Sequence, residues 1–403
     1  QDVFLRDLDA GTTRLVSGRH PGLPPATGAA LSAVELNGLS ADGTQLAFTT
    51  VDSNLAPGDT NGWQDAFVQD LRTGAITPLS VESNGQFTAA HELARRVALS
   101  RDGFASVFLW DAKGFAFEPD ALRFPGNAYW RNRSSGDLLP VNVNLVGTKV
   151  GFIYAPAISP NGRYVLFSCA AAVSDLVAGG SGGDDYITNV FIRDMVAGTN
   201  GLASMNLSGA GLNRPPYGSG AYNLTFSPDG RWVLFYGLGA NLTTNNLSSV
   251  VSLYARDLVA QTTVLVSVGP AGEPNWGYTN GGGFSADSRH VVFVATNGSV
   301  MVRDLGSPTS TMIATNGTAP SLSADGASVA FLAVQGSLAR TNILVHDLST
   351  GVTSLASVAS DDSTANGDSS TPLLSADARY VVFASKADNL VVNDTNRASD
   401  IFV

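Results

Sequence analysis

The stretch Ser227-Pro228-Asp229-Gly230-Arg231-Trp232-Val233-Leu234-Phe235 joins a tight turn to a short apolar strand. Pro, Asp and Gly are turn formers, and the aromatic and β-branched residues that follow them are typical of strands. Turns of the form Ser-x-Asp/Asn-x recur along the chain, nearly always ahead of an apolar run. The copies begin at Ser40, Ser100, Ser159, Ser227, Ser285, Ser323 and Ser375. A repeat of roughly 40 to 60 residues made of short strands predicts propeller blades, not a solenoid of helices.

Each repeat is expected to hold four strands. The repeat that begins at Ser227 continues with strand-like residues 252–258 and 262–267, and a further strand precedes the turn. The third strand ends in Arg/Gln/His-Asp-Leu/Met. The Asp residues of this signature are Asp7, Asp70, Asp194, Asp257, Asp304 and Asp347, and one copy departs with Asn132. Because an Asp that opens a tight turn accepts backbone N–H bonds, we interpret these residues as turn formers and not as a functional ring.

These features resemble the TolB-like, WD40-like (PD40-type) β-propeller repeat of bacterial exported proteins. The consensus of that repeat reads Ser-Pro-Asp-Gly, strand, loop, Asp-Ile-Phe-Val-x-Asp-Leu and x-Thr-Gly, and the resemblance covers nearly the whole chain. It implies a scaffold or protein-binding platform, and in some proteins a substrate gate attached to a hydrolase. Since one fold serves many functions, the function has to be argued from sites.

We therefore predict an all-β fold, a seven-bladed β-propeller of four-stranded antiparallel blades, in one domain that spans residues 1–403. Strands from both chain ends are expected to close the ring, which removes exposed sheet edges. The expected blades are residues 36–80, 97–143, 155–206, 222–267, 281–314 and 319–357, with a partial last blade at 372–403 and closing or donated strands at 1–17.

The third strand occurs eight times although a seven-bladed ring has seven places for it. It opens the chain as Asp2-Val3-Phe4-Leu5 and closes it as Asp400-Ile401-Phe402-Val403. One interpretation is an extra edge strand, a frayed end, or a chain cut from a longer tandem array. Another is pairing of both ends within one chain. In a third, the surplus strand pairs with another subunit, and head-to-tail donation of this kind yields a fibre.

Two similar loops carry oxygen ligands: Asp59-Thr60-Asn61-Gly62-Trp63-Gln64-Asp65 and Asp394-Thr395-Asn396-Arg397-Ala398-Ser399-Asp400. Ca²⁺ takes six to eight oxygens and tolerates irregular geometry, so we predict it as the one candidate cofactor. Its candidate ligands are Asp59, Asn61, Asp65, Asp394, Asn396 and Asp400. The alternative is an Asx-turn in which Asp and Asn cap backbone N–H groups without an ion.

Catalytic patterns find little support in the sequence, and we predict that the protein is not an enzyme. The histidines, His20, His91, His290 and His346, are scattered and have no metal-ligand spacing. Aromatic residues in long loops are candidates for binding glycan or protein by stacking. Those selected are Tyr129, Trp130, Tyr217, Trp276 and Tyr278, and packing beneath the loops is the alternative.

The composition restricts the partners. The net charge is −11 and the only lysines are Lys113, Lys149 and Lys386, which argues against a nucleic-acid partner. No apolar run reaches about 18 residues, so no membrane span is expected. Scarce Lys, a single Cys and polar loops indicate an extracellular or cell-surface protein, with the periplasm as the alternative. The predicted partner is a further copy of the chain or another extracellular protein or glycan; a monomeric binding module and an enzyme are the second and third hypotheses.

Overall fold

The computed structural model describes residues 3–7, 12–16, 32–34, 37–82, 84–87, 94–110, 127–148, 150, 153–182, 187–212, 221–238, 241–244, 250–274, 276–335, 339–359, 361–392, 394–395 and 398–403. The chain divides into two compact units, Gln1–Asn223 and Leu224–Val403, and each is described by itself. Both are built from antiparallel sheets. A single short helix, α1 (Val173–Leu176), lies among the described residues.

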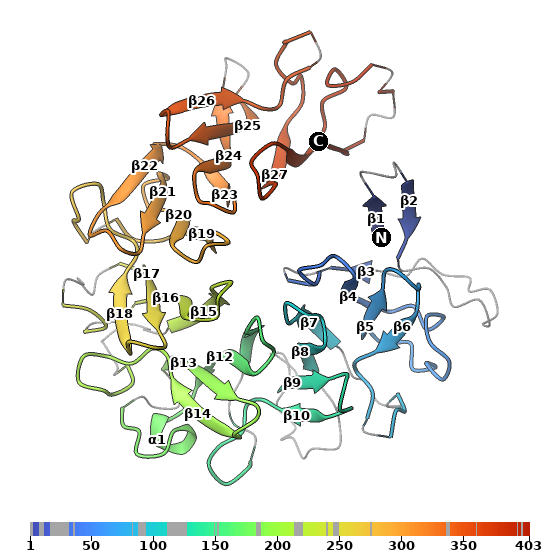
Figure 1. The fold of residues 1–403 in the computed structure, drawn as a ribbon, viewed down its shortest axis with the longest axis vertical. Helices are drawn as coiled ribbons and strands as arrows, with labels where there is room; N and C mark the ends of the chain where they lie inside the picture. The colour runs from blue at the N-terminus through green and yellow to red at the C-terminus, as the bar shows by residue number, and fades with distance from the viewer. Residues whose placement is uncertain are drawn as a thin grey trace. The chain divides into compact units, whose positions relative to one another are not determined.

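The first unit contains one two-stranded sheet and three four-stranded sheets, which follow one another in chain order (Figure 1). The two-stranded sheet, called the end hairpin below, consists of β1 (Phe4–Asp7) and β2 (Thr12–Leu15). The four-stranded sheets are β3 (Ser32–Ala33), β4 (Gln45–Thr50), β5 (Asp65–Asp70) and β6 (Ile76–Pro78); β7 (Ala94–Leu99), β8 (Ala105–Trp110), β9 (Asn127–Asn132) and β10 (Leu138–Pro140); and β11 (Ile153–Ile158), β12 (Tyr164–Ala170), β13 (Thr188–Asp194) and β14 (Thr199–Leu202).

The second unit contains three four-stranded sheets and one sheet of three strands, called the last sheet below. The four-stranded sheets are β15 (Ala221–Phe226), which begins just before the unit boundary, β16 (Trp232–Gly237), β17 (Ser252–Asp257) and β18 (Thr262–Leu265); β19 (Asn280–Phe284), β20 (His290–Val294), β21 (Val300–Asp304) and β22 (Ser310–Ala314); and β23 (Thr318–Leu322), β24 (Ser328–Gln335), β25 (Arg340–Asp347) and β26 (Val352–Leu355). The last sheet is β27 (Ser369–Leu374), β28 (Val381–Ser385) and β29 (Asp400–Phe402).

The Ser turns form as the sequence predicts. In Ser100, for example, Oγ donates to Asp102 Oδ1 at 2.6 Å and accepts the backbone N–H of Ala105 at 2.9 Å. All seven copies make both bonds. The fourth turn position has positive φ; Gly fills it in five copies, whereas Ser288 and Ala378 adopt φ of 62° and 57°. Glycine enters this region at little cost, so the turn itself explains why Gly recurs there.

The Asp residues that end the third strands cap turns wherever their side chains are described, which confirms their structural interpretation there. Asp194 Oδ1 accepts the backbone N–H groups of Val196 and Ala197, each at 3.0 Å. Asn132 makes the same two bonds with Ser134 and Ser135, at 2.9 and 3.3 Å. The departure from Asp at that position therefore leaves the turn intact.

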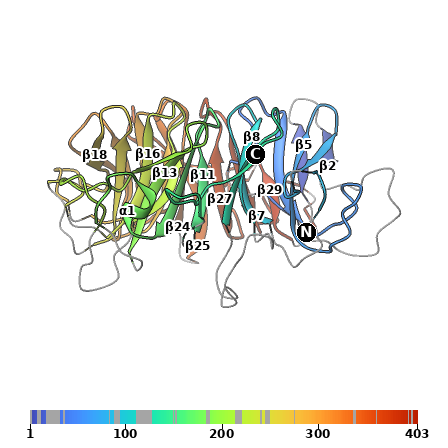
Figure 2. The same cartoon turned by 90° about the horizontal axis from the view of Figure 1, so that it is seen from below.

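The cores lie between the faces of successive sheets within each unit. An aromatic pair joins the second and third strands at the same register in several sheets, as in Phe48–Phe67, where the ring centroids are 5.9 Å apart. Seen edge-on in Figure 2, the strands of each unit run between two sets of loops. The four-stranded antiparallel sheets confirm the predicted all-β fold, while the seven blades and their closure into a ring remain a prediction.

Candidate functional site

The outer side of the last sheet is exposed where its counterparts are buried. Strand β29 pairs with β28 through Phe383↔Phe402, Ala384↔Ile401 and Ser385↔Asp400. The register position of Ile401 is filled in the six four-stranded sheets by Ala66, Ala128, Val190, Leu253, Val300 and Ile343, each 0% exposed. Ile401 is 69% exposed and Val403 is 61% exposed. These two residues thus present an uncovered apolar edge.

The end hairpin has the register of a third and a fourth strand. Phe4 lies opposite Leu15, and the Val16 N–H donates to the Val3 carbonyl at 2.7 Å. The matching bond in the next sheet, from Leu79 to Ala66, is also 2.7 Å. Val3 and Val16 are buried against a cluster that includes Leu46, Phe48 and Phe67. The hairpin therefore packs on its neighbour as the outer half of a blade would. Asp2 lies outside the described residues, and for Phe4 and Leu5 only the backbone is described.

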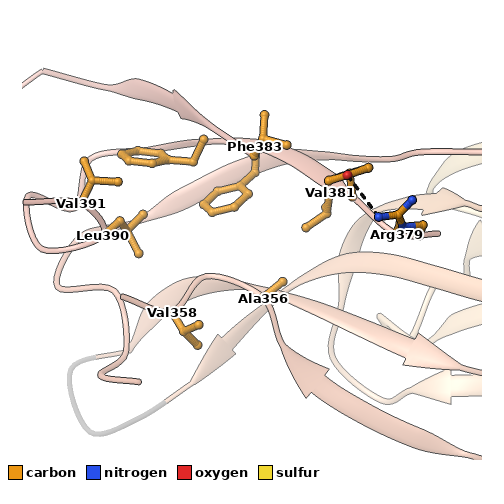
Figure 3. Close-up of a pocket in the computed structure, with 10 residues that line it drawn as sticks. Ala356, Val358, Arg379, Val381, Phe383, Leu390 and Val391 are labelled. Carbon is orange, nitrogen blue, oxygen red and sulfur yellow. Dashed lines mark hydrogen bonds between the residues drawn. The ribbon is translucent and has the colours of Figure 1, made fainter. Parts of the chain in front are cut away.

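A pocket of about 320 Å³ lies beside β29 (Figure 3). Most of the residues that line it have apolar side chains, and Arg379 and Tyr380 are polar. The residues are Ala356, Val358, Arg379, Tyr380, Val381, Phe383, Leu390, Val391, Phe402 and Val403. Ala356 and Val358 follow β26, so the pocket opens between that strand's end and the last sheet. Tyr380 is 50% exposed and Val391 is 50% exposed, which leaves much of this lining in contact with solvent.

Arg379 follows the seventh Ser turn, at a position where three other copies form an ion pair. Arg163 pairs with Asp194 at 2.6 Å, Arg231 with Asp257 at 2.5 Å and Arg289 with Asp304 at 2.6 Å. Each Asp ends the third strand of its sheet, and hydrogen bonding to Arg163 holds the pKa of Asp194 below its usual range. In the part of the chain that the structure describes, Arg379 forms no ion pair. Arg379 was not among the residues predicted from the sequence, where the repeat of Arg after the Ser turn was its signal.

The Arg379 guanidinium lies over the ring of the following aromatic residue, as it does in two of the paired copies. It stacks on Tyr380 at 5.2 Å from the ring centroid, as Arg163 stacks on Tyr164 at 5.2 Å and Arg231 on Trp232 at 5.5 Å. Its Nη2 also lies 3.4 Å from the Tyr380 hydroxyl (Figure 3). Cation–π contact of this kind orients the guanidinium without neutralising it.

In the first predicted calcium loop, Asp59 and Asp65 are buried, at 6% and 2% exposure. Burial, together with the charge of Asp65, raises the pKa of Asp59 to about 7. Asp59 Oδ1 is buried and has no hydrogen-bond partner among the described residues. Asn61 acts as an Asx-turn: its Oδ1 accepts the Trp63 N–H at 2.8 Å, and its Nδ2 donates to Asp65 at 3.2 Å. The bonds of Asn61 agree with the Asx-turn interpretation, and the calcium site stays a prediction.

Asp65 has a structural partner that the sequence analysis missed. Its Oδ1 accepts a bond of 2.6 Å from Ser80, fifteen residues later. The same spacing joins Asn127 to Asn142, Asn189 to Ser204 and Asn342 to Ser357. The bond ties the start of the third strand to the end of the fourth, and the constant spacing in the sequence was its signal. In the second loop, Asp394 and Asp400 are half-buried and Asn396 lies outside the described residues.

Three of the predicted ligand-binding aromatics are core residues, and this corrects their assignment. Tyr129 is 1%, Trp130 6% and Tyr278 7% exposed. Trp130 Nε1 donates to the Gly162 carbonyl at 2.7 Å, so its polar edge is also occupied. Alternation along strand β9 buries both of its aromatics because a sheet packs on each face. Trp276 is half-buried and donates to Glu273 at 2.8 Å, and Tyr217 lies outside the described residues.

Within the described ranges, no three His, Cys, Asp or Glu side chains gather as metal ligands. His290 and His346 lie in different sheets, while His20 and His91 fall in segments that are not described. Across the described residues, no helix has the length and apolarity needed to cross a bilayer.

No family model and no curated protein sequence matches the chain. TolB proteins, the family that the repeat resembles, are among the similar solved structures. TolB from Acinetobacter baumannii is 14% identical, with a TM-score of 0.38; the match covers 72% of this chain and 58% of the TolB chain. An oligogalacturonate lyase from Vibrio parahaemolyticus is 10% identical, with a TM-score of 0.50 over 96% of this chain and 93% of that chain. A prolyl endopeptidase structure is 13% identical, with a TM-score of 0.52 over 92% of this chain and 46% of that chain. At such identities the likeness concerns the fold alone.

Proposed function

We propose that the protein is a non-enzymatic structural or interaction propeller that assembles head to tail with copies of itself through its end strands. The observation that carries the proposal is the division of the ends: a two-stranded end hairpin and a three-stranded last sheet, beside six sheets of four strands. By composition we place it outside the cytoplasm, at the cell surface, in the extracellular space or in the periplasm.

The two end sheets offer complementary edges. In the six four-stranded sheets the third strand is paired on both sides, whereas among the described strands β1 pairs with β2 alone and β29 with β28 alone. Edges of this kind recruit further strands, because main-chain donors and acceptors gain partners and apolar side chains become covered.

A contact between the start of one copy and the end of the next uses two different surfaces. Such heterologous contacts leave a free surface at each end of the assembly, and so copies add without limit unless the rotation between them closes a ring. The expected product is therefore a fibre or a series of oligomers rather than a symmetric dimer.

Sizing chromatography with light scattering, followed by electron microscopy, tests this proposal. The wild-type chain should form oligomers or fibres, and a variant that lacks residues 1–8 should be a folded monomer, because the sheets from β3 onward keep their pairing. A circular dichroism melt of the variant controls for folding. A monodisperse wild-type monomer at high concentration would exclude assembly and favour a monomeric binding module.

We also propose Ca²⁺ as a local staple at the Asp59 loop, and the buried, unpartnered Asp59 Oδ1 supports it. A cation would offset the repulsion that two buried carboxylates exert on each other. Because an ion that binds only the folded form stabilises it, adding Ca²⁺ should raise the melting temperature and chelation should lower it. Asp59→Ala should remove part of that response. An unchanged melting temperature on chelation would exclude the staple.

A further inference from the structure

We infer that the pocket beside Arg379 receives the end hairpin of a second copy, in which Asp7 pairs with Arg379 and Leu15 fills the pocket. The inference rests on the proposed self-assembly and names its contacts. The docked hairpin would take the place of β29 along β28, so that β27, β28, β1 and β2 form one four-stranded sheet.

Register places Asp7 beside Arg379 in such a sheet. In the hairpin Asp7 lies opposite Thr12, as Asp194 lies opposite Thr199 and Asp257 opposite Thr262. Each of those carboxylates also lies opposite the aromatic residue that follows the pairing Arg: Asp194 opposite Tyr164 and Asp257 opposite Trp232. With Phe4 at the position of Phe402, Asp7 lies opposite Tyr380, next to Arg379. The guanidinium stacked on Tyr380 then gains the carboxylate that Arg163 and Arg231 have in their own sheets.

Leu15 matches the apolar part of the pocket. It lies opposite Phe4, as Leu202 lies opposite Phe191 and Leu265 opposite Tyr254. Leu202 and Leu265 are 6% and 3% exposed, whereas Leu15 is 46% exposed. Phe402 lines the pocket, and with Phe4 at its position Leu15, which lies opposite Phe4, reaches the lining that Ala356, Val358 and Val381 form.

The strand that would replace β29 beside β28 has a sequence similar to that of β29. Asp2-Val3-Phe4-Leu5 repeats the polar and apolar pattern of Asp400-Ile401-Phe402-Val403. The ring pair Phe383–Phe402, with centroids 5.7 Å apart, would be replaced by a pair of Phe383 with Phe4. The docked hairpin would also pair with Val381 and Tyr380, and it would supply a complete fourth strand. Docking therefore keeps what β29 supplies and adds an ion pair, further strand pairing and apolar burial.

Charge reversal tests the pair and the source of the hairpin together. Asp7→Arg and Arg379→Glu each place like charges together, so each variant alone should associate at least about 30-fold more weakly than wild type. Mixed in equal amounts, the two variants should associate again, because the Asp7 hairpin of one fits the Arg379 pocket of the other. This holds even if Arg at position 7 loosens its own hairpin turn. Arg72→Glu, at an exposed pair with Asp42, is the matched control and should assemble normally.

The outcomes separate this inference from the proposed function. Single variants that assemble like wild type would overturn the Asp7–Arg379 pair, while loss of assembly on removal of residues 1–8 would still support end-strand exchange. A second outcome is a mixture that stays monomeric while a single chain with both substitutions, Asp7→Arg and Arg379→Glu, assembles as wild type does. The hairpin would then dock within its own chain, and the proposal of a second copy would be overturned. A wild-type chain that never assembles would overturn the proposed function itself.

Discussion

The sheet β15–β18 and the last sheet begin alike and end differently. Each has a Ser turn followed by an Arg stacked on an aromatic ring, Arg231 on Trp232 and Arg379 on Tyr380. In β15–β18 the third strand runs on to Asp257, which is 2% exposed, and the fourth strand buries Leu265. In the last sheet Tyr380 and Ile401 remain 50% and 69% exposed. The inner strands thus suffice to form the turn and the stacked Arg, whereas closing the outer side takes a complete third and fourth strand.

Removing one phenylalanine from a complete sheet and its counterpart from the last sheet should sharpen this contrast most. Phe67 is 0% exposed and Phe402, at the same register, is half-buried. Phe67→Ala should lower the free energy of unfolding by about 3 to 5 kcal/mol, since it leaves a cavity in a packed core. Phe402→Ala should cost less than half as much in a monomer without residues 1–8. Denaturant unfolding checks both, and equal losses would mean that the last sheet is as well packed as the others.

The two Asp-Thr-Asn loops extend the comparison to pH. Because the pKa of Asp59 is raised from 3.8 to about 7, the folded chain holds a proton that the unfolded chain loses above pH 4. This carboxyl should therefore make stability fall as pH rises from about 4 to 7, by up to about 1.4 kcal/mol per unit, and leave it level above 7. Asp59→Asn should flatten that slope in chelator, and Asp394→Asn, in the half-buried copy, should change it less. Unfolding at several pH values measures it; an unaltered slope in Asp59→Asn would contradict the account.

Exposed leucines on two fourth strands provide a smaller test. Leu15 and Leu139 are 46% and 39% exposed, but only Leu15 is assigned to the pocket. Leu15→Glu should weaken association roughly 30-fold by burying a charge in an apolar site. Leu139→Glu, the matched control, should assemble as wild type does. Sedimentation equilibrium gives both values, and similar behaviour of the two variants would remove Leu15 from the interface.

The smallest expected difference concerns the arginines in a monomer without residues 1–8. Arg231→Ala should lower the free energy of unfolding by roughly 1 kcal/mol, because Asp257 is buried and loses its partner. Arg379→Ala should change it by less than about 0.5 kcal/mol, since no ion pair is broken. Thermal unfolding compares them. A larger loss for Arg379→Ala would show that this residue already has a stabilising partner within its own unit.

The repeated sheets could be predicted from the sequence because each uses the same local chemistry. The Ser turn and the Asp cap depend on residues two to five positions apart, so the sequence displays them directly. Burial could not be predicted in the same way. Tyr129 and Trp130 follow an aromatic-rich segment and suggest a ligand shelf, yet alternate faces of β9 pack them into two cores.

The candidate site was only partly visible in the sequence. The surplus third strand at Asp2 and Asp400 could be counted, because it repeats a strong pattern. The repeat of Arg after the Ser turn gave a signal for Arg379 but not for its role. The importance of Arg379 and Leu15 lies in contacts that other copies make, Arg163 with Asp194 and Leu265 in its core, and that these two do not. Comparing equivalent positions by their partners and exposure was needed to find them.

Cross-linking between two chains tests the central claim most directly, namely that the last sheet is completed by the end hairpin of another copy. In the proposed register Leu5 lies opposite Val382, and the native Cys169 is fully buried. Leu5→Cys and Val382→Cys, made in separate chains and mixed under mild oxidation, should give a disulfide-linked dimer, since paired strands bring Cα atoms within about 5.5 Å. Neither variant alone should give this product. Assembly without any cross-link, or a cross-link that forms only when both cysteines lie in one chain, would contradict the account.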